Sequence, residues 1–508
     1  MRETGVRIEL CLVSHTNAGK TTLARTLLGR DVGEVRDSAH VTQTADAHEL
    51  LATDAGDRLI LWDTPGFGDS ARLHKRLSAS AQPLGWFLSH VWDRWTDQAF
   101  FLSQEAMRAA RDSADVVLYL VNVTEEPAEA GYLMPELKLL AWLDKPVIVL
   151  LNQTGQAQDP RQPDAELARW AGHLRDIPAV RDVLPLDAFT RCWVHEHAFF
   201  QAVGKWIGDA KKAGYRRLQQ TWQQRNIDRF ARAMDVVAGQ IADAARERQI
   251  VAPHSAWAGI KGWLAGRTGP EPAQRLSHRA LTDMLTSGRS RTTRELLALH
   301  GLQGKSEDPF LKGLDAADLE SRTPLDPVRA GIGGALASGG ASGLAADLAS
   351  GGLTLGTGAL LGAIGGALLF ALGAEGSNRA RGTQQESVRL SDAALRGLLQ
   401  DALLKYVAIA HFGRGRGDFR QESMPQSWIR QSQQIIAAEA PTLDHILARI
   451  RSDGSDTRAR NVLGTTTRSI ALDILAWLYP DADIDAVRRT LQAAHRDTPS
   501  GQPHDVQA

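Results

Sequence analysis

Short apolar runs alternate with helix-like segments over residues 1–204. The runs expected to form strands are residues 8–13, 48–53, 58–62, 116–121, 147–151 and 182–186. They contain Val, Leu or Ile and are bounded by polar turns, a pattern typical of strands. Their alternation with helices predicts a three-layer α/β domain with a mostly parallel sheet. Residues 54–57, Asp-Ala-Gly-Asp, predict a hairpin-type turn between the second and third runs.

The pattern changes to helical spacing beyond this domain. Residues 199–251 predict one long helix or a broken pair, and shorter helices are predicted over residues 253–328. Further amphipathic helices are expected at residues 388–409, 427–450, 465–478 and 484–494. We divide the chain into an α/β domain (1–204), a helical region (205–328), a Gly/Ala-rich hairpin (329–376), a second helical region (377–495) and a disordered tail (496–508).

The Gly/Ala-rich stretch at residues 331–373 carries a single charged residue, Asp347. Residues 353–372 have about the length of a membrane-crossing helix. Gly358, Gly362 and Gly366 recur at a spacing that lets helix backbones approach closely. Arginines flank the stretch on both sides, which favours a hairpin with both ends cytoplasmic over a single crossing. We expect membrane contact, and the alternative is a helical hairpin buried in a soluble domain.

Composition narrows the class of protein. The chain has 508 residues with 23% charged and 43% hydrophobic positions, which is ordinary globular material. A formal net charge of −1 gives no bias toward nucleic acid, so a nucleic-acid partner is not expected. Two cysteines, Cys11 and Cys192, indicate no disulfide framework, and we expect no secretory signal before the first strand. We expect a cytoplasmic protein, with a peripheral or integral position at the inner face of the cytoplasmic membrane if residues 331–373 contact lipid.

Residues 14–21, Ser-His-Thr-Asn-Ala-Gly-Lys-Thr, lie between the first strand and a helix predicted at residues 22–28. This is the context of a phosphate-binding loop, whose backbone amides and helix N-terminus attract phosphate oxygens. Lys20 would reach the β- and γ-phosphates, and the Thr21 hydroxyl would bind Mg²⁺. Ser14 stands where a glycine is usual, which costs some backbone freedom. The alternative is a loop that merely joins a core strand to a helix.

A second motif, Asp63-Thr64-Pro65-Gly66, ends the third strand, at the carboxyl edge where the phosphate loop also lies. An aspartate there can bind Mg²⁺ through water, and the Gly66 amide can meet a γ-phosphate. Such a short pattern also occurs in turns without a ligand. Its position relative to the phosphate loop therefore carries the assignment.

The phosphate loop is followed along the chain by Thr44, by Asp63-Thr64-Pro65-Gly66 and by residues 152–155, Asn-Gln-Thr-Gly. This order of motifs resembles that of the translation-factor-type GTPases. Asn17 and the Asp-Thr-Pro-Gly form resemble the TrmE–Era–EngA branch, over residues 5 to about 200. The whole-chain layout resembles an uncharacterised bacterial group in which such a domain precedes a domain of unknown function.

This resemblance implies a set of nucleotide-binding residues: Asn17, Ala18, Gly19, Lys20, Thr21, Thr22, Asp63, Gly66, Asn152, Gln153 and Ala188. Lys20, Thr44 and Gly66 would act at the γ-phosphate, with Thr42 as the alternative to Thr44. Mg²⁺ would be held by Thr21, Thr44 and Asp63, and K⁺ by Asn17. The partners implied are GTP and GDP, together with a second copy of the domain in a face-to-face dimer.

Two departures from the family pattern bear on function. Gly155 stands where relatives have the aspartate that reads guanine, and Gln153 replaces a lysine, so guanine preference comes from the resemblance alone. Phe67 stands where Ras-like enzymes carry the water-orienting glutamine, and a phenyl ring cannot orient water. We expect a GTP-hydrolysing switch that acts at or near a membrane. The alternatives are a ribosome- or RNA-associated GTPase, or a nucleotide-binding structural protein with little or no hydrolysis.

Overall fold

A computed structural model describes most of the chain. The residues described are 5–30, 45–78, 98–153, 165–186, 188, 192–247, 249–250, 272–302, 387–388, 390–412, 424–453, 455–480 and 482–496. Thr42, Thr44, Gly155, the hairpin at residues 329–376 and the tail at 497–508 lie outside the described residues.

The N-terminal domain is built on a six-stranded sheet. Its strands are β1 (Arg7–Ser14), β2 (Asp46–Ala52), β3 (Arg58–Asp63), β4 (Val116–Asn122), β5 (Val147–Asn152) and β6 (Val180–Pro185). The order is β2-β3-β1-β4-β5-β6, in which β2 is antiparallel to β3 and all other neighbours are parallel. The central strands are apolar along their length because helices cover both faces of the sheet. The prediction of a three-layer α/β fold with a mostly parallel sheet is confirmed.

Helices pack on the two faces of this sheet through two separate hydrophobic clusters. They are α1 (Lys20–Leu28), α2 (Ser70–Leu77), α4 (Gln98–Asp112), α5 (Leu133–Ala141), α6 (Ala165–Leu174) and α7 (Trp193–Trp206). In β1, Leu10 and Leu12 point into the cluster that contains α1 and α7. Cys11 and Val13, which alternate with them, point into the cluster formed with α4, α5 and α6.

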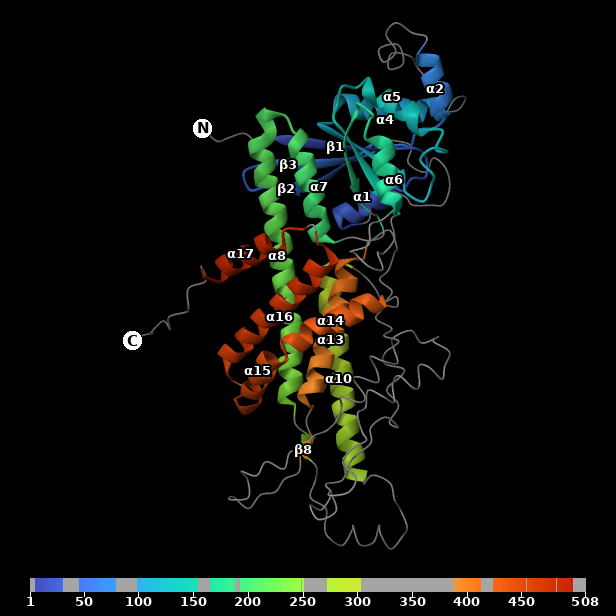
Figure 1. Ribbon diagram of the computed structural model, residues 1–508. Helices are drawn as coiled ribbons and strands as arrows, with labels where there is room; N and C mark the ends of the chain where they lie inside the picture. The colour runs from blue at the N-terminus through green and yellow to red at the C-terminus, as the bar shows by residue number, and fades with distance from the viewer. Residues whose placement is uncertain are drawn as a thin grey trace, which may run out of the picture.

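The C-terminal region is helical. Its helices are α8 (Asp209–Arg246), α10 (Pro272–Leu299), α13 (Asp392–Ala410), α14 (Gln426–Ala438), α15 (Ala440–Ser452), α16 (Thr457–Leu478) and α17 (Ile484–Arg496), with a short ladder of β7 (Gln249–Ile250) and β8 (Ser387–Val388). Helix α8 runs beside the sheet and then through the helical region, where it packs against α10, α13, α15 and α16 (Figure 1). One hydrophobic cluster therefore continues from the sheet domain into the helical region.

Two helix boundaries refine or correct the sequence prediction. The segment predicted as one long helix or a broken pair is a pair, because Ile207 and Gly208 adopt extended backbone between α7 and α8. The single helix predicted over residues 427–450 is wrong, since α14 ends before Glu439 and α15 begins at Ala440. Pro441 lies in the first turn of α15, where its missing N–H does no harm, and it cannot continue α14. Among the described helices, none is long and apolar enough to cross a membrane.

Two aspartates at the amino edge of the sheet bind the first turns of α8. Asp57 precedes β3, and its carboxylate accepts hydrogen bonds from the Arg217 guanidinium at 2.7 and 2.8 Å and from the Val6 amide at 3.0 Å. Asp115 precedes β4 and pairs with Lys211 at 2.7 Å. The hydrogen bonds from Arg217 are the main reason that the pKa of Asp57 lies well below its usual range. These ion pairs fasten α8 to the edge of the sheet opposite the phosphate loop.

Candidate functional site

The phosphate loop turns sharply between the end of β1 at Ser14 and the start of α1 at Lys20. Asn17 has φ 65° and Gly19 has φ 92°, in the left-handed region that glycine and asparagine tolerate best. A Cβ on Gly19 would also lie 2.8 Å from the Asn152 amide nitrogen, so a larger residue does not fit there. The loop therefore brings its backbone close to the carboxyl end of β5 and to the N-terminus of α1.

Lys20 is buried below the loop, with only 7% of its surface exposed. Its Nζ donates a hydrogen bond to the Ser14 hydroxyl at 2.8 Å. Burial lowers the pKa of Lys20 to about 8, although Asp63 and Glu136 act in the opposite direction. A buried cation of this kind would gain from an anionic ligand such as phosphate. Ser14 therefore supplies a hydroxyl to the site, in addition to replacing the usual glycine.

Thr21 and Asp63 meet in front of the loop, where the Thr21 hydroxyl donates to Asp63 Oδ2 at 2.7 Å. Asp63 is 2% exposed, and its Oδ1 has no hydrogen-bond partner within the described part of the chain. Burial raises the pKa of Asp63 above its usual value. An orphaned carboxylate oxygen beside a hydroxyl fits a hard cation such as Mg²⁺. Within the described residues, no group of three His, Cys, Asp or Glu residues could hold a metal ion. A cation here would thus need hydroxyl, water or phosphate oxygens as well.

The segment after β3 lies directly on the phosphate loop. Phe67 N donates to Ser14 O at 2.9 Å, and the Thr16 hydroxyl donates to Phe67 O at 2.7 Å. The Phe67 ring is fully buried in the cluster with α4 and α5 and so takes no part in a polar reaction. A Cβ on Gly66 would lie 2.8 Å from Thr16 Cα, so only glycine permits this approach.

Asn152, the last residue of β5, joins two loops at the carboxyl edge of the sheet. Its side-chain amide donates to Ala18 O at 2.9 Å and accepts from Ala188 N at 2.8 Å. The Thr26 hydroxyl of α1 donates to Ala188 O at 2.7 Å. Because both ends of the Asn152 amide are used, this residue positions the phosphate loop and the loop around Ala188. Gln153 follows it with φ 63°.

The structure brings most of the sequence-predicted residues to one place. The phosphate-loop residues Asn17 to Thr22 lie beside Asp63, Gly66, Asn152 and Ala188, all at the carboxyl edge of the sheet. Thr44, the predicted third ligand of Mg²⁺, lies outside the described residues. The role of Asn17 as a K⁺ ligand remains a prediction.

One polar cluster beside the loop was missed by the sequence reasoning. Glu136 of α5 is fully buried and accepts hydrogen bonds from His15, Ser70 and Tyr119. The signal in the sequence is a carboxylate on the apolar face of a helix, since Leu133 and Leu140 lie one turn to either side. A buried carboxylate requires several donors, and the sequence does not show where they come from.

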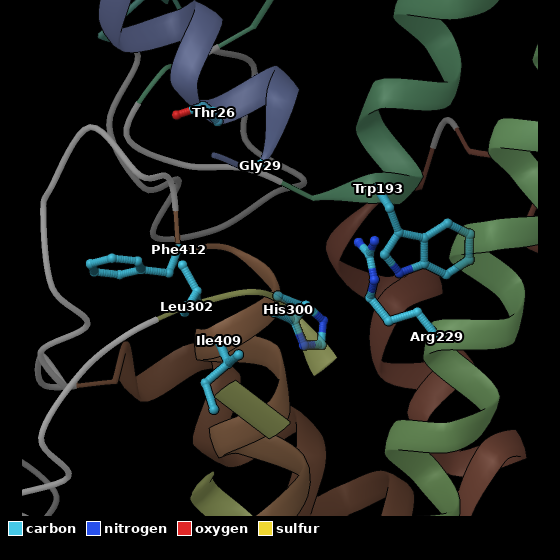
Figure 2. Close-up of a pocket in the computed structure, with 9 residues that line it drawn as sticks. Thr26, Gly29, Trp193, Arg229, His300, Leu302, Ile409 and Phe412 are labelled. Carbon is cyan, nitrogen blue, oxygen red and sulfur yellow. The ribbon is translucent and has the colours of Figure 1, made fainter. Parts of the chain in front are cut away.

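A small cavity lies where the end of α1 meets the helical region. It has a volume of about 30 Å³ and is lined by Thr26, Gly29, Trp193, Arg229, His300, Leu302, Ile409, Ala410 and Phe412. Figure 2 shows that these residues come from α1, α7, α8 and the ends of α10 and α13. The space suffices for about two water molecules and is far too small for a nucleotide.

Comparisons with known proteins find two family models that match separate parts of the chain. Residues 9–153 match the family model described as 50S ribosome-binding GTPase. Residues 183–473 match the model described as a domain of unknown function, DUF3482. No curated protein matches the sequence. The N-terminal part of the chain is accordingly a GTP-binding P-loop GTPase domain, and a DUF3482 domain follows it.

Solved structures with detectable similarity include structures of Era and engB. A structure of Era with MgGDPNP and nucleotides 1506–1542 of 16S ribosomal RNA is 15% identical, covers 58% of this chain and 90% of that chain, and has a TM-score of 0.29. A variant of Aquifex aeolicus Era bound to GDP and AlF4⁻ is 14% identical, with the same coverage of 58% and 90% and a TM-score of 0.30. A probable GTP-binding protein, engB, is 16% identical, covers 35% of this chain and 88% of that chain, and has a TM-score of 0.22. Similarity at this level does not support an inference about function.

Proposed function

The chain belongs to the family defined by DUF3482, and we propose that its P-loop domain binds GTP with Mg²⁺ and hydrolyses it as a switch. One observation carries this proposal. A buried lysine and a buried aspartate, one of whose carboxylate oxygens has no hydrogen-bond partner among the described residues, lie at the same edge of the sheet. Lys20 offers a buried positive charge, while Thr21 and Asp63 offer adjacent oxygens. Together they suit a phosphate chain accompanied by a divalent cation.

Each of these residues has a role that follows from its position. Loop amides between Ser14 and Lys20 would bind phosphate oxygens, and Lys20 would exchange its bond with Ser14 for a phosphate oxygen. Thr21, Asp63 and Thr44 would hold Mg²⁺, which neutralises charge that develops on the phosphates. The Gly66 amide would bind the γ-phosphate. Asn152 would keep the loop around Ala188 beside the nucleotide base.

Hydrolysis needs a group that takes the place of the usual glutamine, because the Phe67 ring is buried away from the site. We assign this role to a potassium ion held by the side chain of Asn17. Support comes from the left-handed backbone of Asn17 and from its place in the loop. An ion there would act as an arginine finger does, a role worth about 10³–10⁵ in rate. Pairing of two such domains face to face would complete the ion site.

The first experiment is calorimetry of the full chain with GTP and with ATP, both with Mg²⁺. Tighter binding of GTP is expected, and equal affinity for the two nucleotides would contradict the guanine assignment.

The second experiment compares steady-state phosphate release in potassium and in sodium at matched ionic strength. Wild type should be faster in potassium, and Asn17→Ala should remove the difference. Equal rates in both salts would exclude the potassium role.

We further propose that the switch acts at or near a membrane, which the Gly/Ala-rich sequence of residues 331–373 and its flanking arginines support. We expect the full chain to float with anionic liposomes and a variant lacking residues 331–373 to stay in the soluble fraction. A full chain that remains monodisperse and ignores the liposomes would favour the buried hairpin.

A further inference from the structure

The helical region shares a hydrophobic cluster with one of the two faces of the sheet. This cluster begins at α1 and α7 and continues through α8, α10, α13 and α16. The cluster on the opposite face, formed with α4, α5 and α6, consists of residues of the sheet domain alone. Within the described part of the chain, hydrophobic packing therefore connects the helical region to the sheet domain by way of α1 and α7.

The end of α1 lies against the helical region. Thr26 and the capping residue Gly29 line the small cavity together with Leu302, which follows α10, and Phe412, which follows α13 (Figure 2). The Thr26 hydroxyl also donates a hydrogen bond to Ala188 O at 2.7 Å. Thr26 therefore connects Ala188 to the wall of this cavity.

A second connection begins at Trp193, the first residue of α7. Its indole Nε1 donates to the Tyr406 hydroxyl of α13 at 3.4 Å. Tyr406 is buried, and its ring meets Phe230 of α8 and His300 at the end of α10 edge to face, with centroids 5.9 and 5.8 Å apart. Tyr406 therefore joins the start of α7 to three helices of the helical region.

Both connections lead to Ala188, which is fully buried and precedes α7 in the chain. Its backbone amide donates to Asn152 Oδ1 at 2.8 Å, and the Asn152 amide donates to Ala18 O of the phosphate loop at 2.9 Å. A series of hydrogen bonds thus runs from α1 through Ala188 to the phosphate loop. It passes on the side of the site where the nucleotide base would lie.

We propose that Tyr406 and Trp193 are positioning residues through which the helical region sets the rate of nucleotide release. This inference rests on the proposed nucleotide function of the same site. While α1 and α7 stay packed on the helical region, Ala188 and Asn152 stay in place beside the nucleotide. Release requires these contacts to loosen, so its rate follows the fraction of molecules in which they are loosened. A ligand that deforms the helical region would speed nucleotide exchange without touching the nucleotide.

The test measures how fast a fluorescent GDP analogue leaves the full chain with Mg²⁺ after excess unlabelled GDP is added. Tyr406→Phe should raise this rate about threefold, the effect of losing one long hydrogen bond between neutral groups. Trp193→Phe removes the same bond from its other side and keeps the test valid if Tyr406→Phe does not fold. Thr26→Val should raise the rate about fivefold, because its bond to Ala188 is shorter.

The matched control is Ser432→Ala, which removes a buried hydrogen bond between Gln400 of α13 and α14, inside the helical region. It should lower the melting temperature, as Tyr406→Phe does, and leave the release rate unchanged. An equally raised rate in Ser432→Ala would mean general loosening of the fold. A wild-type rate in Tyr406→Phe and Trp193→Phe would confine control of release to the sheet domain. Either result overturns the inference.

Thermodynamic linkage supplies a second measurement. If packing on the helical region slows the release of GDP, bound GDP must in turn stabilise that packing. GDP should therefore slow amide hydrogen exchange at the end of α13 more than in α14, and equal effects on the two helices would contradict the inference. A wild-type chain that binds neither GDP nor GTP would refute the proposed function, and the inference with it. A chain that binds GDP but shows no change in release rate among the variants would refute the inference alone.

Discussion

Asp57 and Asp63 lie at opposite ends of β3 and are both buried, yet their carboxylates have different surroundings. Asp57, at the amino edge, has an arginine, a backbone amide and a threonine hydroxyl around its carboxylate. Asp63, at the carboxyl edge, has one threonine hydroxyl and an oxygen without a partner among the described residues. The pKa of Asp57 is lowered, chiefly by hydrogen bonds from Arg217, while burial raises the pKa of Asp63.

This comparison shows at which edge of the sheet buried charges lack partners that a ligand could supply. At the amino edge, buried charges are paired and attach α8 to the sheet, so they contribute to stability. At the carboxyl edge, Lys20 and Asp63 are buried without full compensation, which costs stability that a ligand would restore. Substitutions at the two edges should therefore separate stability from nucleotide binding.

The largest effect on stability is expected from Asp57→Asn, which removes the negative charge that pairs with the Arg217 guanidinium. Asp57 is buried and accepts hydrogen bonds from three groups, so removing its charge should cost about 3 kcal/mol of unfolding free energy, with little change in nucleotide affinity. Asp63→Asn should leave stability unchanged or raise it by about 1 kcal/mol, because the charge it removes is poorly solvated. Chemical denaturation of both variants measures this.

The control for this pair is Asp182→Asn, at the exposed ion pair with Lys205. It should alter stability by less than about 1 kcal/mol. Equal losses of stability in Asp57→Asn and Asp63→Asn would show that the two edges do not differ.

The contribution of Asp57 to stability should persist at neutral pH and be lost as the pH falls below about 4. The reason is that the pKa of Asp57 is lower in the folded protein than in the unfolded chain.

The next effect concerns Lys20→Ala. Loss of a charged hydrogen-bond donor to two phosphates should weaken Mg²⁺·GTP binding by about 100-fold or more. The fold should survive, because the lysine charge is desolvated in the free protein. Calorimetry and a thermal melt check both parts, with exposed Lys75→Ala as the control. Unchanged affinity in Lys20→Ala would remove the nucleotide site from this edge.

The smallest effect is a pH dependence of nucleotide binding. The pKa of Lys20 is lowered to about 8 in the free protein, and a bound phosphate would raise it again. Above pH 8 binding should therefore take up a proton, and affinity should fall by up to about tenfold per pH unit. Titrations at pH 8.5 in two buffers of different ionisation enthalpy would count that proton. Zero proton uptake would mean that Lys20 is fully charged before the ligand arrives.

Much of the α/β domain was predictable because its signals are local. Apolar runs bounded by turns predicted the strands, and the Asp-Ala-Gly-Asp turn predicted the antiparallel pair β2 and β3. The helical region was less accessible, since the break between α14 and α15 depends on one proline that periodicity overlooks. The contact of α8 with both the sheet domain and the helical region also could not be predicted, because Arg217 and Asp57 are 160 positions apart.

The spacing of the phosphate loop, and the placement of Lys20, Thr21, Asp63 and Gly66 after strands, could be predicted from the sequence alone. Those features depend on residues within a few positions of one another, where backbone geometry and side-chain periodicity act directly. Which buried charges have hydrogen-bond partners depends on tertiary contacts. Glu136 obtains donors from three separate elements, and Asp57 obtains its arginine from α8, whereas Asp63 keeps an oxygen unpaired among the described residues. The state of a buried charge depends on neighbours that chain folding brings together, and no local pattern records them.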